Sequence, residues 1–165
     1  MNTLQIESIL SHDPFTASIF AGVYARDTLP FIDSGCCIFN TAPSHEKHGH
    51  WIALFITKNS VEYFDSYGGK PSILIKKIMR KKNWKHNPFT LQSPLSAVCG
   101  QYCVYYLYHR ARGQSMRKIL SVFDPSDVDE NDETVHKFVE NMFGVDIKLL
   151  DTYAVVNQLA KSMVS

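Results

Sequence analysis

The segment 48–69, HGHWIALFITKNSVEYFDSYGG, constrains the fold more than any other part of the chain. Two runs rich in aromatic and β-branched residues, 51–58 and 61–67, flank a short polar stretch. Such runs around a turn are typical of two antiparallel strands joined as a β-hairpin. We therefore expect a hairpin, and its register decides which side chains share a face.

The expected register brings a histidine and an aspartate together. If Lys58 and Asn59 form a two-residue turn, Asp65 lies opposite Ile52 and on the same sheet face as His50. That is one diagonal step, about 7–8 Å between backbones. A slip of one residue would move the aspartate to the other face. The hairpin thus predicts a neighbouring imidazole and carboxylate.

Strand patterns gather in the middle of the chain, and helical patterns lie toward both ends. This arrangement favours an α+β fold with a central mixed or antiparallel sheet and flanking helices rather than alternating βαβ units. A length of 165 residues fits one domain, 1–165. The expected helices are 3–10 (extended or restarted over 15–24), 71–83, 99–113, 132–143 and 149–163, and the further expected strands are 35–42 and 87–93.

Composition indicates an ordinary globular protein, with 45% hydrophobic residues, 20% charged residues and a net charge of +1. Such a small net charge gives no overall field favouring nucleic acid. No apolar run reaches the roughly 18–20 residues of a membrane-spanning helix, and the segment 1–13 lacks the basic region of a signal peptide. We expect a protein of the cytosol, the nucleus or the inside of a particle, without a membrane partner.

The cysteines form a poor disulfide framework, because two are adjacent and two lie four apart in a helical context. Free thiols are expected in a reducing compartment for Cys36, Cys37, Cys99 and Cys103. A cluster of histidines could supply half of a zinc site, but no second pair with zinc-like spacing accompanies His45, His48 and His50. No metal site is predicted.

The segment 91–103, LQSPLSAVCGQYC, contains a candidate nucleophile for the histidine and aspartate of the hairpin. Pro94 disfavours a helix, so Cys99 falls where an irregular segment meets the long helix 99–113. A thiol at a helix N-terminus feels the positive end of the dipole, which lowers its pKa and favours the nucleophilic thiolate. Cys99 is therefore a candidate nucleophile, whereas alone it would be a small buried residue.

Three further residues complete a candidate catalytic set. His50 would act as general base and pair with the thiolate, and Asp65 would fix the histidine tautomer. The simpler interpretations are a histidine at a strand edge and an aspartate that begins a turn. Gln92 would form an oxyanion hole with the Cys99 backbone N–H, unless its side chain faces solvent.

Ordered segments of the N-terminal two-thirds resemble the adenovirus-type maturation protease (adenain), of the cysteine protease clan that includes the SUMO-specific proteases. They are FAGVYARDTLPF (20–31), CCIFNTA (36–42), GHWIALF (49–55), YFDSYG (63–68) and Q-x6-C-G-x-x-C (92–103). The resemblance implies a papain-like active-site arrangement with nucleophile Cys99, base His50, orienting acid Asp65 and oxyanion donor Gln92. It also implies that Trp51 borders a narrow substrate tunnel selecting glycine near the cleaved bond.

The implied function is a cysteine endopeptidase that cleaves precursor proteins of a virus or virus-like element during particle maturation. The virion and the host nucleus would be its locations, and its chemistry would need no cofactor. The sequence departs from the adenovirus enzymes in carrying Asp65, as SUMO proteases do, in place of glutamate. It also has no cysteine between Asp65 and Gln92, so we expect no disulfide-linked activating peptide there. The resemblance does not extend over segment 114–165.

A basic run lies within the expected helical region 72–85. A solvated helix face is the simpler interpretation, but adenovirus proteases use DNA as a cofactor, so the resemblance also implies a phosphate-binding patch. A neighbouring aromatic residue, Trp84, would add stacking. The candidate DNA-binding residues are Lys76, Lys77, Arg80, Lys81, Lys82 and Lys85.

Two other functions fit the sequence. A deubiquitinating or deSUMOylating enzyme of the same clan is supported by Asp65 and by DSYGG (65–69), although 165 residues leave little room for a ubiquitin-recognition surface. A non-catalytic DNA-binding domain that retains the protease fold is the alternative from another class. A thiol pKa near the unperturbed value of about 8.5 would favour that domain.

Overall fold

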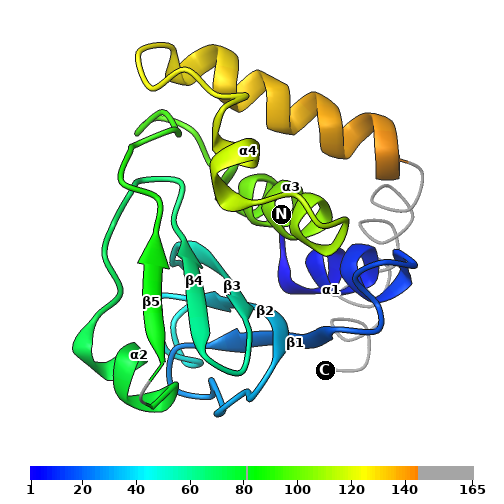
Figure 1. Ribbon diagram of the computed structural model, residues 1–165. Coiled ribbons are helices and arrows are strands. Elements are labelled where there is room, and N and C mark those ends of the chain that lie inside the picture. Colours follow the sequence, from blue (N-terminus) through cyan, green and yellow to red (C-terminus); the bar gives the residue numbers. More distant parts are fainter. Residues whose placement is uncertain (81, 145–165) are drawn as a thin grey trace, which may run out of the picture.

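The computed structural model describes residues 1–80 and 82–144, which form an α+β fold (Figure 1). This confirms the expected fold class. The elements are α1 (Thr3–His12), β1 (Phe20–Ala25), β2 (Gly35–Asn40), β3 (Trp51–Ile56), β4 (Ser60–Phe64), α2 (Ile73–Ile78), β5 (Asn83–His86), α3 (Cys99–Ala111), α4 (Met116–Leu120) and a helix over 128–144. The predicted helix 149–163 lies outside the described residues.

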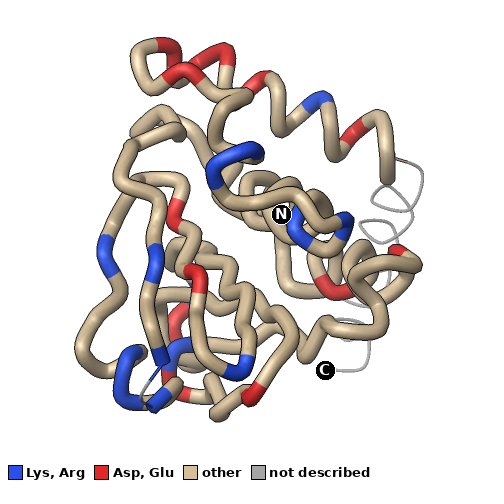
Figure 2. Tube along the Cα trace, in the orientation of Figure 1, with Lys and Arg blue, Asp and Glu red and all other residues tan. Residues whose placement is uncertain are grey.

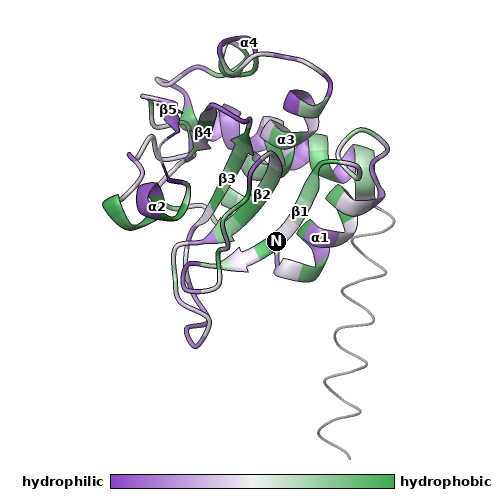
Figure 3. Cartoon of the chain, turned by 60° about the horizontal axis from the view of Figure 1, so that its bottom comes forward, coloured by the Kyte–Doolittle hydropathy of each residue, from purple (hydrophilic) through white to green (hydrophobic). Residues whose placement is uncertain are grey.

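The five strands form one mixed sheet in the order β1-β2-β3-β4-β5. The two outer pairs, β1 with β2 and β4 with β5, are parallel, and the two inner pairs are antiparallel. The central strands β2 and β3 carry the most apolar residues of the sheet, as Figure 3 shows. The hairpin of β3 and β4 is therefore flanked by β2 on one side and by β5 on the other.

The hairpin has the predicted register. Ala53 pairs with Phe64, and the Thr57 N–H donates to the Ser60 carbonyl at 2.8 Å across the two-residue turn. If the pairing is continued by one residue beyond Ala53 and Phe64, Asp65 lies opposite Ile52. The prediction made from the length of the turn is confirmed.

The sheet has a buried layer on each face. Alternating side chains of β2 divide between them, with Cys36 and Ile38 in the layer under α1 and α3. Cys37 and Phe39 belong to the opposite layer, which α2 and the loop around Ile32 cover. All four cysteines are free thiols. The fold thus fixes α3, which begins at Cys99, against one face of the hairpin.

Two of the expected elements are wrong. Residues 15–24 do not continue the first helix, because Thr16 and the Asp13 carboxylate bond to each other after the helix end, and β1 then pairs with β2. The strand expected at 87–93 is irregular, and β5 lies upstream at Asn83–His86. At Asn83–His86 the chain pairs with β4. No local sequence pattern identifies these residues as the partner of β4.

The basic run does not form one helix. Capped by Ser72, α2 ends at Ile78, and Arg80 has a left-handed backbone (φ 56°) that turns the chain toward β5. Figure 2 shows several positive segments around α2 and this turn, and others at α4 and near the end of α3. Trp84 is partly buried and packs its ring against the core near Tyr63, 6.4 Å between centroids, so it does not form an exposed platform. Lys81 lies outside the described residues.

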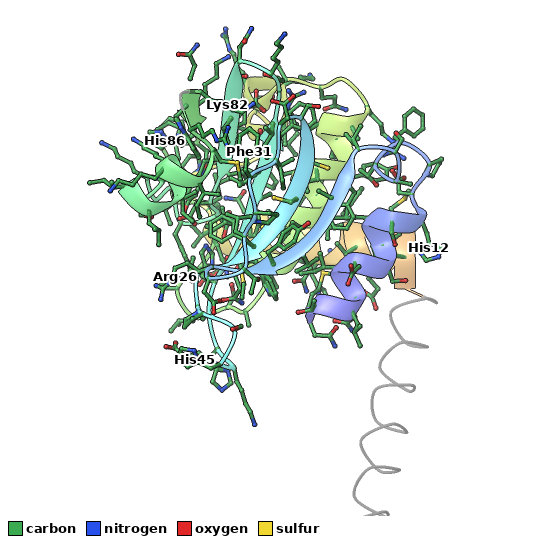
Figure 4. All side chains as sticks on the ribbon, turned by 90° about the horizontal axis from the view of Figure 1, so that it is seen from below. His12, Arg26, Phe31, His45, Lys82 and His86 are labelled. Carbon is green, nitrogen blue, oxygen red and sulfur yellow. The ribbon has the colours of Figure 1, made fainter. Side chains whose placement is uncertain are left out.

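Lys82 differs from the other cations of the run because its side chain is only 5% exposed. Its ammonium donates to the backbone carbonyls of Asp33, Thr57 and Lys58 at 2.7, 2.8 and 3.0 Å. Figure 4 shows Lys82 beside Phe31, in the loop before β2. The side chain therefore joins the hairpin turn to this loop and is not free to bind phosphate.

Replacing Lys82 with methionine should lower the free energy of unfolding by about 1–3 kcal/mol, because three carbonyls lose their donor. Urea unfolding followed by circular dichroism measures this change. The exposed Lys77 provides the control, since Lys77→Met should change stability by less than about 0.5 kcal/mol. Equal effects of the two substitutions would contradict the joining role of Lys82.

Candidate active site

His50 and Asp65 meet where the strands of the hairpin end. His50 directly precedes β3, and its backbone is anchored to Thr41 by two hydrogen bonds, of 2.8 and 3.0 Å. Its Nε2 lies 2.7 Å from Oδ1 of Asp65, with the side chains 20% and 10% exposed. Since a carboxylate accepts, Nε2 carries the proton and leaves Nδ1 for another partner. The structure brings together the two residues that the register predicted.

The loop that follows β4 encloses the Asp65 carboxylate. Oδ1 also accepts the Tyr67 N–H at 2.8 Å, and Oδ2 accepts the Gly69 N–H at 3.2 Å. A Cβ atom on Gly69 would lie 2.5 Å from Oδ2, so this approach requires glycine. The Asn87 side chain bonds the Asp65 backbone N–H and carbonyl at 2.9 and 2.5 Å. The carboxylate therefore has a fixed direction toward the imidazole.

Cys99 is the first residue of α3, as predicted, and it is half-buried. The His50 imidazole and the Trp51 backbone N–H lie close enough to the Cys99 sulfur to stabilise its thiolate form. The first N–H groups of a helix have no acceptor within the helix. The thiol therefore combines an imidazole, a backbone donor and a helix N-terminus.

The charges of this pair differ from those of isolated side chains. Burial disfavours a charged imidazole, but the hydrogen bonds to Asp65 and Cys99 outweigh it and raise the pKa of His50 to about 9. Burial also opposes ionisation of Cys99, yet the His50 hydrogen bond and the Trp51 N–H hold its pKa below the ordinary thiol value. The two groups titrate as a pair, and the arrangement favours thiolate with imidazolium.

This pairing predicts a pH dependence. Alkylation of Cys99 by iodoacetamide should rise through a midpoint below about 8.5, the ordinary thiol value, because the thiolate is the reactive form. Peptide hydrolysis should fall above about pH 9, as His50 loses the proton that a leaving amine needs. Rates of alkylation and of peptide hydrolysis measured across pH 5–10 test these two expectations. Urea-unfolded protein is the control for the alkylation midpoint. A native midpoint equal to the unfolded one would contradict the pairing.

Gln92 is buried, with 1% of its surface exposed, so the solvent-facing alternative does not hold. Its Oε1 accepts the Ser66 hydroxyl at 2.6 Å, which fixes the orientation of the amide. Its Nε2 donates to the carbonyl and the hydroxyl oxygen of Ser96 at 3.1 and 3.2 Å. The amide nitrogen thus faces the short loop that leads into Cys99.

Trp51 lines a cleft of about 490 Å³ together with Cys99. The indole N–H donates to the Met1 carbonyl at 3.3 Å. A Cβ atom on Gly100 would lie 3.0 Å from Cβ of Met1, so glycine at this position lets Met1 approach the start of α3 closely, beside the indole. The predicted wall residue therefore borders the space beside the thiol.

Tyr67 and Asn87 are parts of the site that sequence reasoning missed. The Tyr67 ring packs on the His50 ring, with 4.7 Å between centroids and 32° between planes. Tyr67 stands two residues after Asp65, so its position in the DSYGG turn was a usable signal. No local signal identifies Asn87, because it reaches Asp65 only through the pairing of β5 with β4.

The described part of the chain contains no converging group of three metal-ligating side chains. His45 lies at the tip of an exposed loop, away from the other labelled histidines (Figure 4). Within residues 1–80 and 82–144, no helix combines the length and apolar character needed to cross a bilayer.

No protein-family model and no curated protein matches this sequence. The solved structures of similar fold include the crystal structures of the ASFV pS273R protease and of its Se-Met form. The first aligns with a TM-score of 0.56 and 17% identity over 79% of this chain and 63% of that one, and the second with 0.54 and 16% over 80% and 64%. The chain therefore spans less than two-thirds of these proteins. At this identity the likeness shows the fold alone, and it does not single out adenain.

Proposed function

We propose that this chain is a cysteine protease with Cys99 as nucleophile. One observation carries the proposal: His50 is hydrogen-bonded to the Asp65 carboxylate at 2.7 Å and interacts with the Cys99 thiol, which lies at a helix start. This is the nucleophile–base–orienter arrangement that hydrolyses acyl bonds on several unrelated folds. The fold shared with the ASFV pS273R protease is consistent with it.

In the proposed reaction, the Cys99 thiolate attacks the carbonyl carbon of the scissile bond. The negative charge that develops on the oxygen is stabilised by the Cys99 backbone N–H and by the Gln92 amide, which exchanges one of its two hydrogen bonds to Ser96 for the oxyanion. The His50 imidazolium then gives its proton to the leaving amine, and a thioester remains. Neutral His50 takes a proton from water, hydroxide adds to the thioester, and the carboxylic acid product leaves as the thiolate–imidazolium pair re-forms.

The cleft beside Trp51 is the proposed site for the acyl side of a polypeptide substrate. The wall that the indole forms at Cys99 supports a preference for glycine near the cleaved bond. Since the ASFV protease is viral, we extend the proposal to an endopeptidase that matures precursor proteins in a virus particle, in the virion and host nucleus. We also propose that a viral peptide can activate the enzyme without a disulfide, because the chain has no cysteine between Asp65 and Gln92 to form one.

The first experiment compares substrates. Purified protein is assayed with a fluorogenic Gly-Gly peptide, a ubiquitin-type conjugate and a SUMO conjugate. Turnover of the short peptide with intact conjugates would support the endopeptidase, whereas conjugate cleavage alone would support the isopeptidase alternative. If no substrate is cleaved and Cys99 is alkylated no faster than a free thiol, the catalytic proposal fails.

DNA remains a proposed activator, bound by the exposed cations Lys76, Lys77, Arg80 and Lys85. Adding duplex DNA to the peptide assay tests it, because phosphate contacts would give a stimulation that falls as salt rises. The engaged Lys82 ammonium should contribute nothing to this effect. The same titration tests the non-catalytic DNA-binding alternative, which predicts binding without turnover.

A further inference from the structure

The helix 128–144 contacts the loop that carries Gln92, and polar side chains near the start of the helix, Asn131 and Asp132, make this contact. The Asp132 carboxylate, 9% exposed, accepts the Ser93 N–H at 3.2 and 3.4 Å. The Tyr102 hydroxyl lies 2.9 Å from Asp132 Oδ1. In the described part of the chain, no Lys, Arg or His forms an ion pair with this carboxylate. Its partners are therefore the loop and α3.

The position of Ser93 determines where the Gln92 side chain can lie. Ser93 and Ser96 form a tight turn, in which the Ser93 carbonyl accepts the Ser96 N–H at 3.2 Å and its hydroxyl at 3.1 Å. Gln92 in turn donates its amide to Ser96. A displacement of Ser93 would therefore move both the backbone after Gln92 and the residue that orients its amide.

The backbone before Gln92 is held from the same side. The Leu91 carbonyl accepts the Tyr102 hydroxyl at 2.9 Å and the Asn131 amide at 3.2 Å. Tyr102 belongs to α3, the helix that begins at Cys99, and lies one turn further along it. The Gln92 backbone is thus tied on both sides to one polar cluster that also contacts the nucleophile's helix.

We propose that Asp132 is a positioning residue for oxyanion stabilisation, a role that rests on the proposed protease function. It holds Ser93, and through the turn it keeps the Gln92 amide at a fixed place relative to Cys99. The side chains hydrogen-bonded to His50 and Cys99 do not include Asp132. Its loss should therefore impair the step that builds up negative charge on oxygen and leave the thiolate pair intact.

The test uses two reactions of the same thiol. Alkylation by iodoacetamide displaces iodide and needs no oxyanion hole, whereas peptide hydrolysis and the binding of a peptide aldehyde both place charge on an oxygen. In Asp132→Asn, we expect kcat to fall about 10- to 100-fold and aldehyde affinity to fall with it. The alkylation rate and KM should stay within twofold of the wild-type values. Glu133→Gln, an exposed neighbour that pairs with Lys137, is the control and should change none of them.

Three results would overturn this role. If kcat is unchanged in Asp132→Asn, Asp132 has no positioning role. If kcat and the alkylation rate of Cys99 fall in parallel, Asp132 is merely a structural residue. If Asp132→Asn does not fold, Tyr102→Phe carries the test, since it removes the hydroxyl shared by Asp132 and Leu91 and keeps the ring. A wild-type protein that cleaves nothing and has an ordinary thiol would refute the protease function itself, and this role with it.

Discussion

Replacing Cys99 with alanine is expected to reduce peptide hydrolysis to background, a loss of at least about 10³-fold, because no other group can form the thioester. The remaining cysteines cannot take its place, since all three are buried in the core. The measurement is the initial rate of fluorogenic peptide cleavage by equal amounts of the two proteins. Circular dichroism should give the same spectrum for both, because a half-buried thiol contributes little to packing.

Cys103 supplies the matched control. It lies on the same helix one turn later, and burial raises the pKa of its thiol well above the ordinary value, so it should be inert. Cys103→Ala should keep its rate within about threefold, with a stability loss of about 1 kcal/mol for the small cavity. Turnover that persists in Cys99→Ala, or disappears only in Cys103→Ala, would place the nucleophile elsewhere.

The second large effect concerns Asp65. In Asp65→Asn the imidazolium loses its ionic partner, so the pKa of His50 should fall and that of Cys99 should rise. We expect peptide hydrolysis at pH 7 to fall on the order of 10²-fold or more. The alkylation midpoint of Cys99 should move to higher pH by about one unit. Stopped-flow alkylation and peptide cleavage across pH measure both quantities.

Two further variants distinguish the effect of the Asp65 charge on His50 from an effect of the substitution on folding. Asp65→Glu keeps the charge, but Gly69 leaves little space at the carboxylate, so an intermediate rate is expected. Asp129→Asn removes an exposed carboxylate and should change neither quantity. A fall in hydrolysis for Asp65→Asn without any shift of the alkylation midpoint would mean that the aspartate supports the loop and not the imidazole.

Local sequence was sufficient for the hairpin and for the start of α3. A two-residue turn admits one register, so the distance from Asn59 to Asp65 decides the face that Asp65 takes. Pro94 keeps the chain irregular ahead of Cys99, and α3 begins at Cys99 as expected. These features depend on neighbours in the chain, and for this reason they were predictable.

Elements whose position depends on distant partners were not predictable. The region 71–93 contains both helical and extended patterns, and pairing with β4 decided that β5 occupies Asn83–His86. The same pairing brings Asn87 to the Asp65 backbone and removes Lys82 from the surface. From the sequence alone, a basic side chain such as that of Lys82 is expected to be exposed to solvent. Only the tertiary structure shows that its ammonium donates hydrogen bonds to backbone carbonyls.

The sequence by itself determined the residue types of the candidate site and the register that unites His50 with Asp65, because turn length and helix start are local properties. Only the tertiary structure decided how these residues are supported. It laid Tyr67 on His50 and brought Asp132 from the helix 128–144 to the loop of Gln92. The physical reason is that burial creates unsatisfied donors and acceptors, and their partners come from whichever element packs nearby.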